Sequence, residues 1–123
     1  MTCPFCQLEK KDILLENEWA VAIYDQYPVQ KGHMLIIPKG HVETYFDATD
    51  RQIAAIHELL RQGKQMLDRE YAPDGYNIGV NVGRYGGQTI PHLHVHLIPR
   101  YKGDVEDPRG GIRKAIPNLV DYP

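Results

Sequence analysis

The sequence predicts a single α+β domain, in which an antiparallel sheet is covered by one long helix and a short helix lies near the N-terminus. The 123 residues are enough for one hydrophobic core but not for two. Three β-rich apolar runs separated by short turns come first, then one amphipathic segment, then two more strand-like runs. Short turns between strands favour antiparallel pairing, with helices segregated to one side of the sheet.

The N-terminal part of the chain is expected to supply the short helix and three strands. Residues 3–11 carry both cysteines and are expected to form one short helix or turn. Strands are expected at 13–16 (ILLE), 19–24 (WAVAIY) and 33–37 (HMLII), because each run is apolar and rich in β-forming residues. The segment 26–32 contains a proline and a glycine and is expected to be a loop.

The long helix is expected to follow Thr49 and to extend to about residue 70. Thr49 and Gln52 have the spacing of a capping box, in which each side chain bonds the other residue's backbone. Apolar residues then recur at helical spacing and form a stripe that should face the core: Ile53, Ile56, Leu59, Leu60, Met66 and Leu67.

The last two strands are expected at 76–82 (YNIGVNV) and 91–100 (PHLHVHLIPR). The glycine-rich loop 83–88 (GRYGGQ) should connect them. The segment 102–123 shows no periodicity, so we expect an irregular tail that acts as an arm at a dimer interface or at an active site.

Charge and composition exclude several classes of function. The net charge of −2 argues against a protein that binds nucleic-acid polymers, although a small phosphorylated ligand needs only a local group of donors. The sequence has no apolar run of membrane-spanning length, and its first residues do not resemble a signal peptide. We therefore expect a cytoplasmic protein without a membrane partner, whose two cysteines are thiols or metal ligands rather than a disulfide.

The most informative motif lies in the last expected strand, where His92, His94 and His96 alternate with apolar residues. On a strand these three imidazoles would share one face, and the apolar residues between them would face the core. One hypothesis is that they bind a catalytic metal ion such as Zn²⁺, which activates a water molecule. The other is that one histidine attacks phosphorus as a nucleophile while its neighbour handles protons.

The loop before these histidines favours the second hypothesis. Gly86 and Gly87 allow close backbone approach, and Gln88 and Thr89 add neutral donors suited to phosphate oxygens. Taken alone, the same loop would be interpreted as an ordinary hairpin turn.

Four other residues have both a functional and a structural interpretation. Asp25 ends an apolar strand, where it would accept a hydrogen bond from a ribose hydroxyl or begin a turn, and Asn81 is equally ambiguous. Phe5 and Leu8 would form one wall of a pocket for a base or fill the core.

The pair Cys3 and Cys6 has the C-x-x-C spacing of many zinc sites, but zinc needs two more ligands. His41 and one of the alternating histidines would supply them in a closed, structural Cys₂His₂ site. The residues alone leave zinc binding open.

Together these motifs resemble the histidine triad (HIT) family of nucleotide hydrolases and transferases. The run 92–98 (HLHVHLI) matches the family signature His-φ-His-φ-His-φ-φ at every position, where φ is apolar. The segment 32–41 (GHMLIIPKGH) resembles the family's central strand, and 81–89 resembles its glycine-rich phosphate loop. The resemblance covers roughly residues 3–101, which implies a HIT domain over 1–101 followed by the tail 102–123.

The resemblance implies a nucleotidyl hydrolase that cleaves at the α-phosphate and releases a nucleoside monophosphate. His94 would form a covalent nucleotidyl-histidine intermediate, and His96 would contact the phosphate and assist departure of the leaving group. Gln88 and Thr89 would hold phosphate oxygens or the leaving group. The implied nucleotide-binding residues are Asp25 at the ribose, Phe5 and Leu8 at the base, and Asn81 and Gly87 at the phosphate.

The resemblance also implies a purine nucleotide substrate, a homodimer and a structural Zn²⁺ held by Cys3, Cys6, His41 and His92. Family members cleave nucleoside phosphoramidates or dinucleoside polyphosphates, and Pro99-Arg100 followed by Gly103-Asp104 leans toward the second branch. Two alternatives stay open. One is a nucleotide-binding or adaptor protein without catalysis, and the other is a metallohydrolase that uses the three histidines as its metal site.

Overall fold

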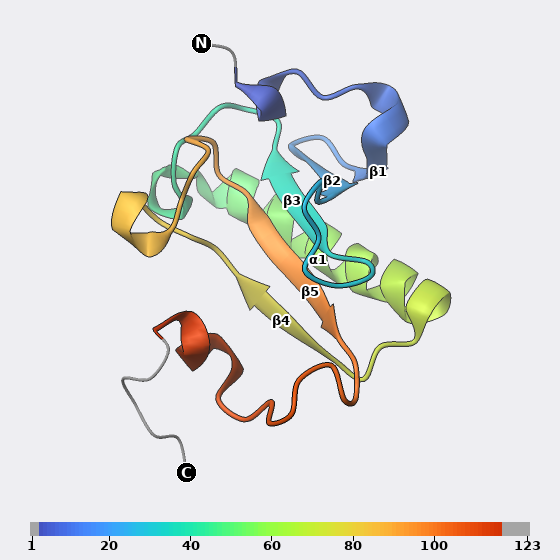
Figure 1. Cartoon of the computed structure of the whole chain (residues 1–123). Helices are drawn as coiled ribbons and strands as arrows, with labels where there is room; N and C mark the ends of the chain where they lie inside the picture. The colour runs from blue at the N-terminus through green and yellow to red at the C-terminus, as the bar shows by residue number, and fades with distance from the viewer. Residues whose placement is uncertain (1–2, 117–123) are drawn as a thin grey trace.

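The computed structural model describes residues 3–116 and shows a five-stranded antiparallel sheet with one long helix packed across it (Figure 1). The strand order is β1-β2-β3-β5-β4. The strands and the long helix are β1 Ile13–Glu16, β2 Ala20–Tyr24, β3 Met34–Pro38, α1 Asp50–Tyr71, β4 Gly75–Gly79 and β5 Val95–Arg100. Short 3₁₀ helices are η1 Pro4–Cys6, η2 Lys10–Asp12, η3 Tyr45–Asp47, η4 Arg84–Gly86 and η5 Gly111–Ala115. The predicted α+β fold is confirmed.

The helix α1 begins at the predicted capping box. The Gln52 backbone N–H donates to Thr49 Oγ1 at 3.2 Å, and the Thr49 backbone N–H donates to Gln52 Oε1 at 2.8 Å. The expected stripe faces the sheet, with Leu59 and Leu67 fully buried. Gly63 allows the close approach, because a Cβ atom there would lie 2.8 Å from the sulfur of Met34.

Strict alternation along the strands gives the sheet two different faces. Residues such as Met34, Ile36 and Leu97 pack against α1 in the main core. The residues between them, such as Leu35 and Ile37, form a second cluster on the opposite face. The second face therefore carries the side chains that the helix does not cover.

The last two strands are shorter than predicted. We expected a strand from 91 to 100, but β5 begins only at Val95; residues 91 and 92 form a bend, and 93 and 94 have no regular secondary structure. The neighbouring strand ends at Pro38, which has no N–H to continue the ladder, and its carbonyl instead accepts from the His92 side chain at 2.9 Å. Because Gly79 pairs with His96 near the start of β5, β4 also ends there rather than at residue 82.

Two further expectations need correction. The N-terminal segment forms two short 3₁₀ helices, η1 and η2, rather than one helix. The tail is not wholly irregular, because η5 forms within it and contacts β4. The rest of the tail, from 117 to 123, lies outside the described residues. Within residues 3–116 no helix has both the length and the apolar character needed to cross a bilayer.

Candidate active site

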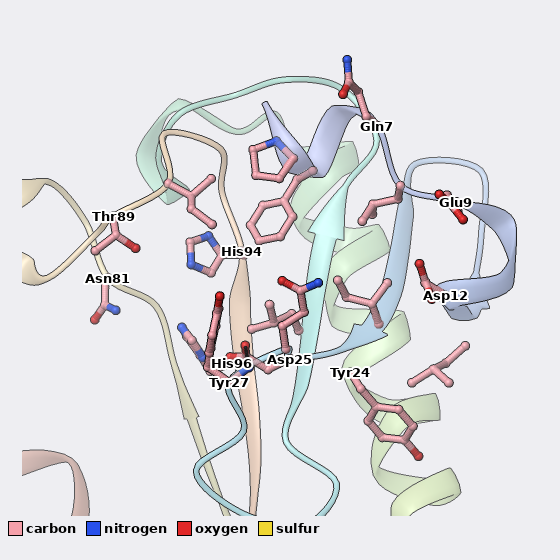
Figure 2. Close-up of a pocket in the computed structure, with 18 of the residues that line it drawn as sticks. Gln7, Glu9, Asp12, Tyr24, Asp25, Tyr27, Asn81, Thr89, His94 and His96 are labelled. Atoms are coloured by element: carbon pink, nitrogen blue, oxygen red, sulfur yellow. Dashed lines mark hydrogen bonds between the residues drawn. The ribbon is translucent and has the colours of Figure 1, made fainter. Parts of the chain in front are cut away.

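A cavity of about 670 Å³ opens on the face of the sheet that α1 leaves uncovered. This volume is in the range of small-molecule sites. His94 and His96 lie at its centre, with Thr89 and Asn81 on one side and Asp25 on the other (Figure 2). Apolar residues from the N-terminal segment, β2 and β3 complete the lining: Phe5, Leu8, Ile23 and Leu35.

The three alternating histidines do not share one environment. The strand begins only at Val95, so His96 alone lies within it, while His92 and His94 precede it. A ring nitrogen of His92 contacts a cysteine of the N-terminal segment, one of His94 contacts a backbone carbonyl, and one of His96 contacts another histidine. The apolar face is as expected, because Leu93, Val95 and Leu97 are buried in the main core.

The side chain of His92 belongs to a cluster with Cys3, Cys6 and His41, whose ligand atoms all lie within 4.8 Å of one another. The His92 Nδ1 atom is 3.3 Å from Cys3 Sγ, 3.5 Å from Cys6 Sγ and 3.1 Å from His41 Nδ1. Tetrahedral zinc at ordinary bond lengths separates neighbouring ligand atoms by about 3.3–3.8 Å. These four residues therefore fit a tetrahedral zinc ion.

The tautomer of His92 suits this role. Its Nε2 lies 2.9 Å from the Pro38 carbonyl oxygen, which can only accept, so Nε2 carries the proton. Burial is the main cause that lowers the pKa of His92, which keeps the ring neutral. The unprotonated Nδ1 then points at the cluster. This is the usual arrangement of a metal-binding histidine, whose other ring nitrogen donates its N–H to a carbonyl.

His94 has the opposite tautomer. Its Nδ1 lies 2.9 Å from the His92 carbonyl oxygen and must donate to it, so in the neutral ring Nε2 carries the lone pair. The Phe5 ring packs edge-on against this imidazole, with centroids 5.1 Å apart. The side chain is 8% exposed and lines the cavity. His94 can therefore present an unprotonated nitrogen there in a fixed orientation.

His96 is oriented by His33, a buried histidine just before β3. The Val29 backbone N–H donates to His33 Nδ1 at 3.1 Å, so the proton of the neutral His33 ring is on Nε2. That nitrogen lies 2.9 Å from His96 Nδ1, which must accept. The Nε2–H of His96 is thus left as a donor. Sequence reasoning missed His33, because its contact with His96 depends on the register between β3 and β5.

The charge state of this pair follows from its surroundings. Burial is the largest cause that lowers the pKa of His96 to about 4, and the nearby His33 and His94 rings act in the same direction. Burial also lowers the pKa of His33, against the opposing effect of Asp25, whose Oδ2 lies 3.4 Å from His33 Nε2. Both rings are therefore neutral near pH 7.

The glycine-rich loop lies beside the histidines and is held by Gln88. The Gln88 Nε2 atom donates to the carbonyls of Glu43 at 2.7 Å and Ile90 at 2.9 Å, and its Oε1 accepts from the Gly83 N–H at 3.0 Å. Its neighbours Gly87 and Thr89 line the cavity. The Gln88 amide is thus bonded within the loop and its surroundings, and its contact with phosphate oxygens or the leaving group stays a prediction.

The four ambiguous residues all line the cavity, and for three of them the structural interpretation also holds. Asp25 Oδ1 accepts from the Tyr27 N–H at 3.0 Å and so also begins a turn. Phe5 and Leu8 also pack against the second apolar cluster. Asn81 is exposed and lies beside Thr89 (Figure 2).

The comparison with protein families shows to which family the chain belongs. Residues 7–103 match the family model described as HIT domain. The chain belongs to the HIT family. It is 36% identical over 118 residues to an uncharacterized HIT-like protein of Methanocaldococcus jannaschii, a match that covers 93% of this chain and 91% of that protein.

The HIT family relatives of this chain include named nucleotide enzymes. The chain is 35% identical over 104 residues to adenosine 5'-monophosphoramidase hnt1 of Schizosaccharomyces pombe, covering 81% of this chain and 75% of that enzyme. It is 30% identical over 95 residues to the asymmetrical bis(5'-nucleosyl)-tetraphosphatase of the same organism, covering 77% of this chain but only 52% of that enzyme. Nucleotide hydrolysis is therefore an activity of relatives in this family.

Solved structures confirm the HIT fold. A protein of Streptococcus mutans superposes with a TM-score of 0.78 at 31% identity, covering 98% of this chain and 74% of that one. A Zn-bound histidine triad family protein from Mycobacterium smegmatis superposes with a TM-score of 0.69 at 31% identity, covering 75% of this chain and 67% of that one. A structural relative thus binds zinc, and the Cys₂His₂ cluster is a candidate zinc site here.

Proposed function

We propose that this HIT protein is a nucleotidyl hydrolase that cleaves between the α-phosphorus of a purine nucleotide and its leaving group, releasing a nucleoside monophosphate. The observation that carries the proposal is the complementary pair of tautomers. His94 offers a lone pair on Nε2, and His96 offers a proton on Nε2, in the same cavity. The named nucleotide enzymes among its relatives support the reaction class.

The first step is attack on phosphorus. The Nε2 lone pair of His94 forms a P–N bond while the bond from phosphorus to the leaving group breaks, and the leaving group keeps that electron pair. The ring of His94 becomes cationic, and the His92 carbonyl stabilises its Nδ1–H. The Nε2–H of His96 hydrogen-bonds the charge that develops on the phosphate or on the leaving group.

The second step regenerates the enzyme. A water molecule attacks phosphorus, the P–N bond breaks, and its electron pair returns to His94 Nε2. The proton lost by water passes to the released group or to solvent, so the sum is addition of water across the original bond. Throughout, the loop that Gln88 holds would position Gly87, Thr89 and Asn81 around the phosphate.

The cavity has a place for the rest of the nucleotide. Phe5 and Leu8 form an apolar wall suited to a base, and Asp25 would accept hydrogen bonds from the ribose hydroxyls. When bound, zinc at Cys3, Cys6, His41 and His92 would brace the N-terminal segment, and with it Phe5, against the histidine segment. The expected homodimer and cytoplasmic location remain predictions.

The deciding experiment measures AMP release from adenosine phosphoramidate and from diadenosine tetraphosphate by the wild type and by His94→Ala. Release by the wild type alone supports the proposal, and the better substrate identifies the branch. Binding of AMP without turnover of either substrate would favour the adaptor alternative.

One observation supports the catalytic-metal alternative. The ligand atoms of Asp25, His33 and His96 also lie within 4.8 Å of one another. This alternative predicts that His94→Ala keeps activity, and that a chelator removes activity at once without unfolding the protein. Those two results together would replace the nucleophilic mechanism.

A further inference from the structure

The single proton on the His33 ring lies between two acceptors. Because His33 Nδ1 accepts from the Val29 backbone N–H, the neutral ring carries its only proton on Nε2. That nitrogen is 2.9 Å from His96 Nδ1 and 3.4 Å from Asp25 Oδ2. A carboxylate is a stronger acceptor than a neutral imidazole nitrogen. Asp25 therefore competes with His96 for the proton, although from a longer distance.

The three residues differ in their access to the cavity. Asp25 and His96 both line it, whereas the His33 side chain is 3% exposed and lies behind them. A bound nucleotide can therefore contact Asp25 through its ribose and His96 through its phosphate, but it does not reach His33. The buried ring joins the sugar end of the proposed site to the phosphate end.

Asp25 retains capacity to accept further hydrogen bonds. Its Oδ1 accepts from the Tyr27 backbone N–H at 3.0 Å, and its side chain is 16% exposed. A carboxylate has about four lone-pair sites, which is more than the contacts with Tyr27 and His33 occupy. Ribose hydroxyls can therefore donate to Oδ2 while the turn at Tyr27 stays intact.

The charge on Asp25 acts on both histidines. It opposes the effect of burial on the pKa of His33 and on the pKa of His96. Hydroxyl donors on Oδ2 would weaken the attraction of this carboxylate for the His33 proton. That proton would then be held by His96 Nδ1, and His96 would keep its Nε2–H as the donor for the phosphate.

We propose that recognition of the ribose strengthens catalysis as well as binding, and that His33 is the positioning residue that couples Asp25 to His96. This assignment rests on the proposed function and gives the sugar a role in the chemical step. Part of the binding energy of the ribose would be used to orient the donor that stabilises the transition state. The protein would then discriminate against nucleotides that lack the ribose hydroxyls in the rate of the bound complex.

The test compares adenosine phosphoramidate with dideoxyadenosine phosphoramidate, which lacks both ribose hydroxyls and has the same leaving group. The deciding quantity is the single-turnover rate of monophosphate release at saturating enzyme, because it compares the two substrates once they are bound. The wild type should release AMP about tenfold faster than the dideoxy product, the effect of one hydrogen bond.

Two variants should bring the ratio of these rates close to one from opposite directions. His33→Ala removes the coupling group, so the rate with adenosine phosphoramidate should fall to about that of the analogue. Asp25→Asn keeps an oxygen for the Tyr27 N–H but replaces Oδ2 by a nitrogen that does not accept, so the rate with the analogue should rise. The matched control His57→Ala removes an exposed histidine of α1 and should keep the wild-type ratio.

The outcomes separate this coupling from the function on which it rests. If the wild type cleaves both substrates equally fast, if His33→Ala keeps the wild-type ratio, or if the control loses it, the coupling is wrong and the hydrolase proposal stands. The same holds if Asp25→Asn gains no rate with the analogue, because Asp25 would then only bind the ribose. If the wild type cleaves neither substrate, both proposals fail. The expected ratios in all four proteins would establish the coupling.

Discussion

His33 Nε2 lies 2.9 Å from His96 Nδ1, and this contact determines which nitrogen of His96 carries the proton. The two rings come from segments far apart in the sequence, and their centroids are 5.2 Å apart. His33 itself is 3% exposed and therefore has little access to a substrate. It is a positioning residue, and it acts through His96.

His33→Ala should lower kcat for AMP release about ten- to a hundredfold with little change in KM, because His96 would lose the donor that fixes its tautomer. His33→Gln places an amide N–H near the position of Nε2 and should recover part of the loss. Steady-state kinetics on both variants provide the measurement. His57→Ala, which removes an exposed histidine of α1, is the matched control and should behave like the wild type. Equal kcat in all four proteins would remove this role from His33.

Stability should fall as the pH is lowered from about 6.5 toward 4. The pKa of His96 is about 4 in the folded protein and about 6.5 in the unfolded chain, so the unfolded chain binds the proton first and protonation favours unfolding. At pH 5 the loss from this residue is at most about 2 kcal/mol, because the ring retains some exposure to solvent. Urea unfolding at pH 7.5 and pH 5 measures it.

The matched comparison for this pH effect is His96→Asn, which has no titrating ring at that position. The difference between its free energies of unfolding at the two pH values should be smaller than the wild-type difference. His57→Ala should keep the full wild-type difference, since that histidine is exposed. A wild-type pH dependence in His96→Asn would show that other groups cause it.

Removal of metal should destabilise the protein before it affects chemistry directly. A zinc ion bound only by the folded state adds about 4 kcal/mol when free zinc is a thousand times its Kd. Cys6→Ser should therefore lower both the zinc content and the midpoint of thermal unfolding, and a chelator should do the same to the wild type. Activity should follow the fraction folded. A wild-type protein that contains no zinc after purification in zinc-supplemented buffer would contradict this assignment.

Gln88→Ala should impair catalysis more than stability. The substitution removes three hydrogen bonds, to Glu43, Ile90 and Gly83, that hold the loop beside the cavity. We expect kcat/KM to fall about tenfold or more, because displacement of positioning groups is costly for catalysis. Gln65→Ala, at an exposed position of α1, is the control and should leave kcat/KM unchanged. Wild-type kcat/KM in Gln88→Ala would show that the loop keeps its conformation without this side chain.

The sequence predicted those features that depend on local patterns. The capping box at Thr49, the stripe of α1 and the burial of Leu93, Val95 and Leu97 all follow from spacing, and the structure confirms them. The start of β5 did not follow from its own residues, because it depends on the end of a neighbouring strand at Pro38. The β-forming alternation of 91–94 was therefore misleading.

For the site too, local patterns predicted some contacts but not those that depend on strand register. Cys3, Cys6, His41 and His92 do lie together. The ligand types indicated Cys3, Cys6, His41 and one of the three alternating histidines, and the resemblance to the HIT family implied that this histidine is His92. The contact of His33 with His96 and of Ile112 with Gly79 depends on the register between segments that are distant in the sequence. Register is a property of the folded sheet, which no local pattern contains.

The alternation of side chains across β5 also constrains how this chain can vary in length. Suppose that one residue were inserted between the bend at 91–92 and the end of β5. The side chains on one side of the insertion would then move to the opposite face of the sheet. Imidazoles would then enter the core under α1, while Leu93 or Val95 would face the cavity. An insertion or deletion within β5 should therefore be more damaging than one in a segment whose length does not set the strand register.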